Sequence, residues 1–241
     1  MRMDISREIE EILTSVDTPT ISNALDIYRG DRSVDDFTKL PFVSSNAKLR
    51  PIIGIARTAK IKASSPSSLP PDELSNLRIK YYEYMAYKHQ NQNVRNLCVI
   101  EDMDWPNIIG SFWGEVNVSI HKGLGLAGTL TNGLLRDLDE IDKNYMVLAS
   151  CIGPSHAYVH VVEFGGEVSV CGLKIKDGDI IHADQHGAVK IPFNALEMLP
   201  KAIKFMQKKE SYIIEAAQKD DFDIEKLKVA WSKANSEKFV E

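Results

Sequence analysis

Glu115, Arg136 and Asp137 are the residues of this sequence whose types and spacing best suit chemistry on a small anionic substrate. Twenty residues, 116–135, lie between Glu115 and the Arg-Asp pair. A guanidinium binds a carboxylate through paired hydrogen bonds, and an aspartate oxygen is a hard ligand that suits Mg²⁺. The pattern predicts an anion site beside a metal ligand, with Glu115 available to orient water or to transfer a proton.

The segment between these residues determines whether they can meet. Its hydrophobic pattern predicts a helix over 113–122 and a strand over 126–130. If the two elements fold back as in a βαβ unit, the turn at 114–115 and the pair at 136–137 lie at the same edge of a sheet.

The predicted helix start would add donors to this site. Free backbone N–H groups at a helix start attract a carboxylate, and the segment concerned is Gly114, Glu115, Val116 and Asn117. Spacing alone supports a second interpretation equally well, in which Arg136 and Asp137 cap a short surface helix over 136–142 together with Asp139 and Glu140.

A glycine pattern and two histidine pairs are weaker candidates for functional sites than Glu115, Arg136 and Asp137. Residues 123–128 read G-x-G-x-x-G, but a nucleotide or S-adenosylmethionine fingerprint needs a strand before the glycines and a helix after them, whereas the order here is reversed. His156 with His160 and His182 with His186 are spaced poorly for zinc. There is no G-x-S-x-G nucleophile motif.

The remaining elements predict an α/β protein. Two amphipathic helices come first, the second capped by Asp17 or Thr18 and ended by Gly30, and a strand follows at 52–61. A Ser/Pro-rich connection at 64–72 precedes a helix at 74–87. Antiparallel strands joined by tight turns follow at 158–183, and two helical segments end the chain, with Pro200 able to kink or split the first of them.

Composition excludes several functional classes. The 241 residues include 29 Lys and Arg and 34 Asp and Glu, with a net charge of −5 and no basic face, which argues against nucleic-acid binding. Cys98, Cys151 and Cys171 lie in apolar runs and are expected to be reduced core thiols. The absence of an apolar run long enough for a membrane helix, and of a signal-peptide pattern, predicts a cytoplasmic protein with one domain over 1–241.

The motifs together resemble the RraA-like family, which includes class II 4-hydroxy-4-methyl-2-oxoglutarate/4-carboxy-4-hydroxy-2-oxoadipate aldolases and the regulator of ribonuclease activity. The resemblance covers most of the chain. It rests on the segments 18–26, 54–58, 113–115, 123–128, 132–140 and 178–187, with Pro192. Residues 31–50 and the 64–87 region depart from the family pattern, so the substrate pocket could differ.

The resemblance implies a layered β/β/α sandwich of the swivelling-domain type, flanked by N- and C-terminal helices. It also implies a divalent-metal-dependent lyase that uses Mg²⁺ or Mn²⁺ and acts on 2-oxo acids. The reaction would be retro-aldol cleavage of a 4-hydroxy-2-oxo acid to pyruvate, oxaloacetate decarboxylation, or both, through a metal-stabilised enolate.

Site roles also follow from the resemblance. Arg136 matches the arginine that binds the substrate carboxylate, Asp137 the metal ligand and Glu115 the preceding acid. Gly114, Val116 and Asn117 complete the segment whose amides hold the pyruvyl end. A further acid, Glu210 or Glu215, would come from the C-terminal helix of a neighbouring subunit in a homotrimer or hexamer.

The family also contains proteins of another class. Its namesake regulator binds a ribonuclease and performs no chemistry, so a non-catalytic binding protein is the alternative function. The acid before Arg-Asp, present here as Glu115, favours catalysis.

Overall fold

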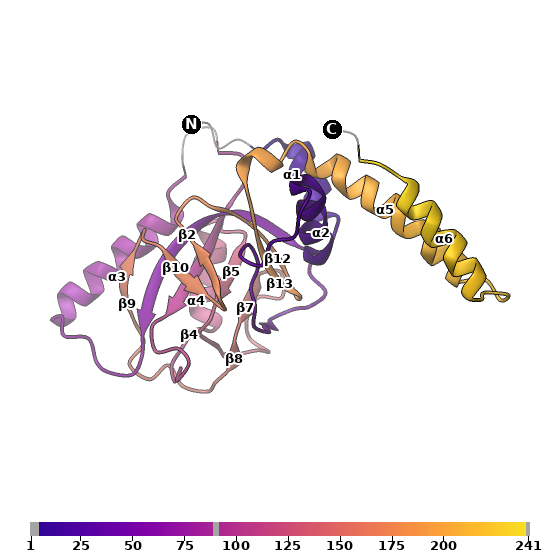
Figure 1. The fold of residues 1–241 in the computed structure, drawn as a ribbon. Helices are drawn as coiled ribbons and strands as arrows, with labels where there is room; N and C mark the ends of the chain where they lie inside the picture. Colours follow the sequence, from indigo (N-terminus) through magenta and orange to yellow (C-terminus); the bar gives the residue numbers. More distant parts are fainter. Residues whose placement is uncertain (1–4, 89–91, 240–241) are drawn as a thin grey trace.

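The computed structural model describes residues 5–88 and 92–239 (Figure 1). The helices are α1 (Arg7–Thr14), α2 (Thr18–Arg29), α3 (Pro71–Ala86), α4 (Glu115–Gly123), α5 (Leu199–Ala217) and α6 (Ile224–Ser236), with a 3₁₀ turn at Phe193–Ala195. The strands are β1 (Val43–Ser44), β2 (Ile52–Lys62), β3 (Asn96–Asp102), β4 (Ser111–Trp113), β5 (Gly128–Thr131), β6 (Leu134–Leu135), β7 (Met146–Ala149), β8 (Cys151–Ile152), β9 (His160–Phe164), β10 (Val168–Val170), β11 (Leu173–Ile175), β12 (Ile180–Asp184) and β13 (Gly187–Ile191).

The main sheet is mixed and has the order β1-β7-β5-β3-β2-β12-β13. Strands β2, β3, β5 and β7 run parallel, whereas β1, β12 and β13 are antiparallel to their neighbours. The second half of β2 pairs with β9. A separate parallel sheet, β4-β6-β8, carries the candidate site.

The two faces of the main sheet are covered by different layers. Because side chains alternate along a strand, Cys98 and Ile100 of β3 pack with α3, α4 and the small sheet, while Leu97 and Val99 pack with the β10–β11 hairpin. Helices α1, α2 and α5 cover β12, β13 and the start of β2. This arrangement confirms the expected layered α/β fold with flanking N- and C-terminal helices.

Helix α2 forms where its end signals predict. Asp17 accepts a hydrogen bond from the backbone N–H of Thr20 (2.9 Å), which satisfies one of the free donors of the first turn. Gly30 ends the helix in a left-handed conformation (φ 73°) that glycine adopts without a steric penalty. The helix then packs on α5 and β13.

The α5–α6 pair projects from the body of the molecule (Figure 1). Pro200 lies in the first turn of α5, where its missing N–H costs nothing, so it begins this helix rather than splitting it. Trp231 of α6 is 54% exposed and Val229 is 70% exposed. This chain therefore leaves apolar surface on the hairpin uncovered. No helix in the described part of the chain is long and apolar enough to cross a membrane.

The cysteine prediction is wrong at one position. Cys98 and Cys171 are buried thiols, as expected, but Cys151 is exposed. It lies in β8, a two-residue strand at the edge of the small sheet, where no strand of the described residues covers its outer side.

Candidate active site

The small sheet brings Glu115 and the Arg136-Asp137 pair together. Strands β4 and β6 are parallel neighbours, with Trp113 opposite Leu135, and the N–H of Arg136 donates to the carbonyl of Trp113 (2.9 Å). The chain continues from β4 into α4, and from β6 into Arg136. Both segments therefore meet at the carboxyl ends of adjacent parallel strands, as the fold-back argument predicts, although the strands involved are β4 and β6 rather than the predicted strand at 126–130.

Asp137 faces the start of α4. Its Oδ2 atom accepts a hydrogen bond from the backbone N–H of Glu115 at 3.2 Å and lies 3.6 Å from Nε of Arg136. The side chain is 36% exposed, so a hydrated cation can reach it. A carboxylate here also complements the positive end of the α4 dipole.

The backbone at Asp137 departs from a helix. Its φ of 57° is left-handed, a conformation that aspartate tolerates better than most residues. The Asp137 carbonyl accepts from the N–H groups of Glu140 (3.1 Å) and Ile141 (2.9 Å), which closes a turn. The short helix expected over 136–142 is therefore absent from this described segment, and the helix-cap interpretation of Arg136 and Asp137 is wrong.

Gly114 makes this close approach possible. It is the N-cap of α4, and a Cβ atom at this position would overlap Oδ2 of Asp137 and lie 3.1 Å from Nε of Arg136. The amides of Val116 and Asn117 have no protein acceptor within the described residues. They are free to bind an anion beside the guanidinium.

A cleft of about 600 Å³ borders this arrangement. Its walls come from the loop before α3, from Arg78 on α3, from Val116 and Asn117, from Arg136, and from residues 156–160. Two arginines and two histidines are among these lining residues, and none of those that the structure describes is an aspartate or glutamate. The two arginines are therefore the charged groups of this lining that can bind an anion.

The side chain of Asn117 is fixed from several sides. Its Nδ2 donates to the carbonyl of Phe112, and its Oδ1 accepts from the hydroxyl of Tyr82 (2.8 Å) and from Nη2 of Arg78 (3.3 Å). Sequence reasoning assigned only the backbone of Asn117 and missed Arg78 and Tyr82. Their spacing of four residues on a predicted helix was the available signal.

A buried histidine, His121, contacts the same first turn of α4. His121 donates from Nδ1 to the carbonyl of Asn117 (2.6 Å), so its Nε2 accepts from the hydroxyl of Tyr81 (2.6 Å). Burial lowers the pKa of His121 to about 4. The imidazole is therefore neutral at neutral pH.

The alternative motifs form no second site. The glycines at 123–128 connect the end of α4 to β5, a helix-to-strand turn of the kind expected. His156 and His160 both line the cleft, with Nδ1 of each near a backbone carbonyl. Throughout 5–88 and 92–239, no three His, Cys, Asp or Glu side chains gather in a metal-binding group.

The donors around Asp137 fit one kind of metal ion. Asp137 would be the one residue at these strand ends to contribute a carboxylate oxygen to a metal ion, and the lack of a side chain at Gly114 makes room for that carboxylate. Mg²⁺ commonly binds through one or two carboxylates and keeps several waters, whereas structural zinc needs four protein ligands. The residues present therefore fit a water-rich Mg²⁺ or Mn²⁺ site and do not fit structural zinc.

Comparison with known proteins agrees with this architecture. The family model RraA-like (Aldolase/RraA) matches residues 18–190. No curated protein matches the chain.

Solved structures show the same fold at low sequence identity. An uncharacterized protein from Pseudomonas syringae pv. tomato superposes with a TM-score of 0.68 and 19% identity, covering 97% of each chain. Streptomyces coelicolor RraAS2, an unusual member of the RNase ES inhibitor RraA family, gives a TM-score of 0.64 and 18% identity over 88% of this chain and 98% of its own. Since the family model spans most of the sequence and the fold agrees, this chain belongs to the RraA-like (Aldolase/RraA) family.

Proposed function

We propose that this protein is a divalent-metal-dependent lyase acting on 2-oxo acids. The reaction is retro-aldol cleavage of a 4-hydroxy-2-oxo acid to pyruvate, decarboxylation of oxaloacetate, or both. One observation carries the proposal: Arg136, Asp137 and the free amides at the start of α4 meet beside a cleft whose described lining has no acidic side chain.

Asp137 would hold the metal ion, Mg²⁺ or Mn²⁺, with water and substrate in the remaining positions. When bound there, the ion would supply Lewis-acid chemistry, polarising the 2-oxo group as the C3–C4 bond breaks. A lysine Schiff base is not required in this scheme.

The protein's own residues bind and orient the substrate. Arg136 would pair with the substrate carboxylate, and the amides of Val116 and Asn117 would add fixed hydrogen-bond donors where negative charge develops. The exposed carboxylate of Glu115 would orient water or transfer a proton at the reacting carbon. Gly114 has no side chain that would displace Asp137 or Arg136.

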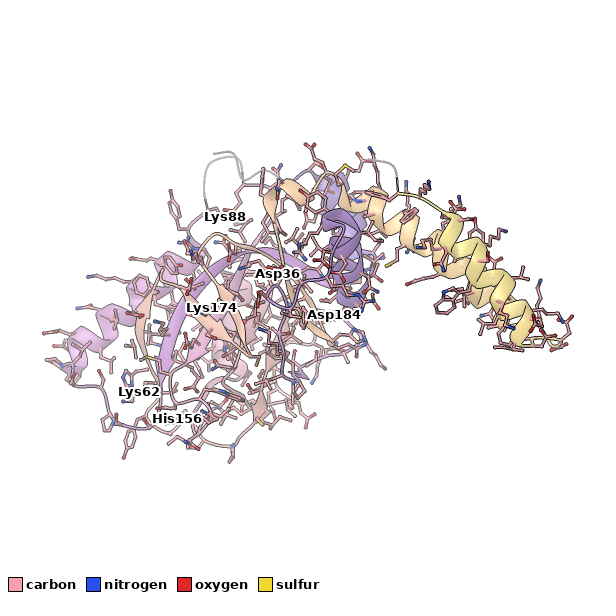
Figure 2. All side chains as sticks on the ribbon, in the orientation of Figure 1. Asp36, Lys62, Lys88, His156, Lys174 and Asp184 are labelled. Atoms are coloured by element: carbon pink, nitrogen blue, oxygen red, sulfur yellow. The ribbon has the colours of Figure 1, made fainter. Side chains whose placement is uncertain are left out.

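A second subunit would complete the site. Glu210 and Glu215 are exposed on α5, which projects away from the body (Figure 1). His156, a lining residue of the cleft, lies at the lower left of the body, away from the α5–α6 pair (Figure 2). An acid from α5 would therefore enter the cleft of a neighbouring copy, as in the proposed homotrimer or hexamer with shared sites.

Binding to a ribonuclease without catalysis is the second candidate function. It is supported by two solved relatives. RraAS2 is named as an unusual member of the RNase ES inhibitor RraA family, and RraA from Thermus thermophilis (TM-score 0.51, 15% identity, 71% of this chain and 92% of that one) is named as an RNA-processing inhibitor. The presence of Glu115 beside Arg136-Asp137 favours the enzyme.

A substrate screen tests the proposal. Oxaloacetate and branched 4-hydroxy-2-oxo acids are supplied with and without Mg²⁺, and pyruvate release is measured. We expect turnover that EDTA abolishes, that Mg²⁺ or Mn²⁺ restores and that borohydride leaves unchanged. Absence of turnover of every 2-oxo acid, together with stoichiometric recovery of a ribonuclease in a pull-down, would establish the alternative.

A further inference from the structure

Arg78 is a fixed positive charge without a carboxylate partner. It lies on the exposed face of α3, where Nε donates to the hydroxyl of Tyr82 (3.1 Å) and Nη2 to Oδ1 of Asn117 (3.3 Å). Its guanidinium carbon is 5.6 Å from the centre of the Phe112 ring. Neutral groups therefore orient this guanidinium, and no described acid lies within ion-pair distance of it.

The remaining donors of Arg78 are available to a ligand. Nη1 has no acceptor within the described residues, and Nη2 makes only one hydrogen bond there although it carries two N–H groups. A guanidinium with this unused capacity, held in a cleft, is well suited to a planar carboxylate. Because the present hydrogen-bond partners of Arg78 are neutral, its positive charge is available to bind such a carboxylate.

Arg78 and Arg136 flank the same turn of helix. Arg136 lies against Gly114, because a Cβ there would come 3.1 Å from its Nε, whereas Arg78 contacts Asn117, three residues further along. Both arginine side chains line the same cleft of about 600 Å³, so one small molecule in that cleft can contact both.

The rest of the cleft wall has no acidic side chain among its described lining residues. Outside that lining, Asp137 lies 3.6 Å from Nε of Arg136 and pairs with it, whereas Arg78 has no acidic partner among the described residues. A ligand with a single carboxylate would satisfy Arg136 and leave Arg78 unpaired.

We propose that Arg78 is a specificity-determining residue that binds a second carboxylate, so that the site selects 2-oxo acids with an anionic group at each end. This inference rests on the proposed function for the position of the first carboxylate at Arg136. Arg78 on α3 would then distinguish dicarboxylate from monocarboxylate substrates. Helix α3 lies in the 64–87 region, which departs from the family pattern.

A binding comparison that needs no turnover tests the role of Arg78. Calorimetry in the presence of Mg²⁺ measures the Kd of 2-oxoglutarate and of 2-oxopentanoate, which has the same number of carbons and lacks the distal carboxylate. We expect the wild-type protein to bind 2-oxoglutarate about 10- to 100-fold more tightly, as a charge-assisted hydrogen-bond pair provides. Arg78→Gln should remove this preference and leave the Kd of 2-oxopentanoate within about twofold.

A matched variant controls for the loss of charge on α3. Lys80 is exposed on the same helix and does not line the cleft, so Lys80→Gln should retain the full preference for 2-oxoglutarate. Thermal unfolding of both variants checks that the fold is unchanged.

Three results would overturn the proposal: no preference in the wild-type protein, equal weakening of both ligands by Arg78→Gln, or binding of neither ligand. If the preference for the dicarboxylate is present and depends on Arg78, but no 2-oxo acid is turned over, the inference about Arg78 stands and the lyase function is wrong.

Discussion

The carboxylate of Asp137 accepts a hydrogen bond from the backbone N–H of Glu115 across the ends of two parallel strands, at 3.2 Å. This contact fixes the end of β6 to the start of α4. It also directs Asp137 Oδ2 into the space that a side chain at Gly114 would occupy. The geometry of the candidate site therefore depends on a glycine as much as on its charged residues.

Gly114→Ala should lower activity about a hundredfold. The added methyl group would displace Asp137 and press on Arg136, and a shift of about 1 Å in a positioned group can cost a hundredfold in rate. Pyruvate release measures the effect. Gly123→Ala is the control, because a Cβ at Gly123, the last residue of α4, meets no atom within 4 Å. It should preserve activity and raise the free energy of unfolding by up to about 1 kcal/mol. Equal activity of Gly114→Ala and wild type would contradict the site geometry.

Arg136→Ala and Asp137→Ala should each reduce kcat/KM by about 10²–10³ with the fold intact, because each removes a preorganised charge from the site. Asp137→Ala should also weaken Mn²⁺ binding, measured by electron paramagnetic resonance, whereas Arg136→Ala should leave Mn²⁺ binding nearly unchanged. Full activity in either variant would refute the roles assigned to this pair.

Local signals in the sequence predicted much of the fold. The Asp17 cap and Gly30 define α2 correctly, and the strand predicted at 52–61 is β2. These features depend on neighbours within a few residues. Strand β6, in contrast, has only two residues and forms through pairing with β4, so no local periodicity could reveal it.

The site was predicted only in part for the same reason. The spacing of Glu115 and Arg136-Asp137 predicted their proximity correctly, because it follows from one fold-back of the chain. The left-handed backbone of Asp137 could not be predicted, since it arises from the turn after β6. Arg78 comes from a helix 39 residues before Asn117 in the sequence, and only tertiary packing brings the two side chains together.

Asp102→Asn should stabilise the protein at pH 7. Asp102 is fully buried at the end of β3, its Oδ2 has no hydrogen-bond partner within the described residues, and burial raises its pKa to about 6. The folded state thus binds a proton more tightly than the unfolded state, so the ionised carboxylate costs up to about 3 kcal/mol above pH 6.

Urea unfolding at two pH values checks this prediction. Asn keeps the Oδ1 acceptor that Asp102 offers to the N–H of Asp104 (3.0 Å) and carries no charge. The gain in unfolding free energy should be large at pH 7 and much smaller at pH 4.5, where wild-type Asp102 is protonated in the folded state. A gain that is the same at both pH values would show that the charge of Asp102 is not the cause.

His121 should remain neutral well below pH 6. Since burial lowers its folded pKa to about 4 while the unfolded chain takes up a proton near 6.5, this residue's contribution to stability is complete above pH 6.5 and is lost as the pH falls toward 4. At pH 5 the loss from His121 is roughly 2 kcal/mol. NMR titration of the imidazole gives the folded pKa directly, and a midpoint near 6.5 would contradict the burial of a neutral His121 ring in this structure.

Mixing inactive variants tests whether neighbouring subunits share a site. Asp137→Asn and Glu210→Gln proteins should each be inactive if Glu210 of one copy acts beside Asp137 of another. After the two proteins are unfolded and refolded together, some sites would contain both native residues and should regain activity, measured as pyruvate release.

The Glu215→Gln variant distinguishes the two candidate acids on α5. If Glu210 is the acid that completes the site, Glu215→Gln alone should retain activity, and the opposite pattern would assign the role to Glu215.

Trp231→Ser, which removes exposed apolar surface from the projecting hairpin, should weaken assembly in sedimentation experiments and reduce activity in parallel. Full activity of a monomeric Trp231→Ser protein would show that one chain forms a complete site, because no neighbouring α5 would then be present.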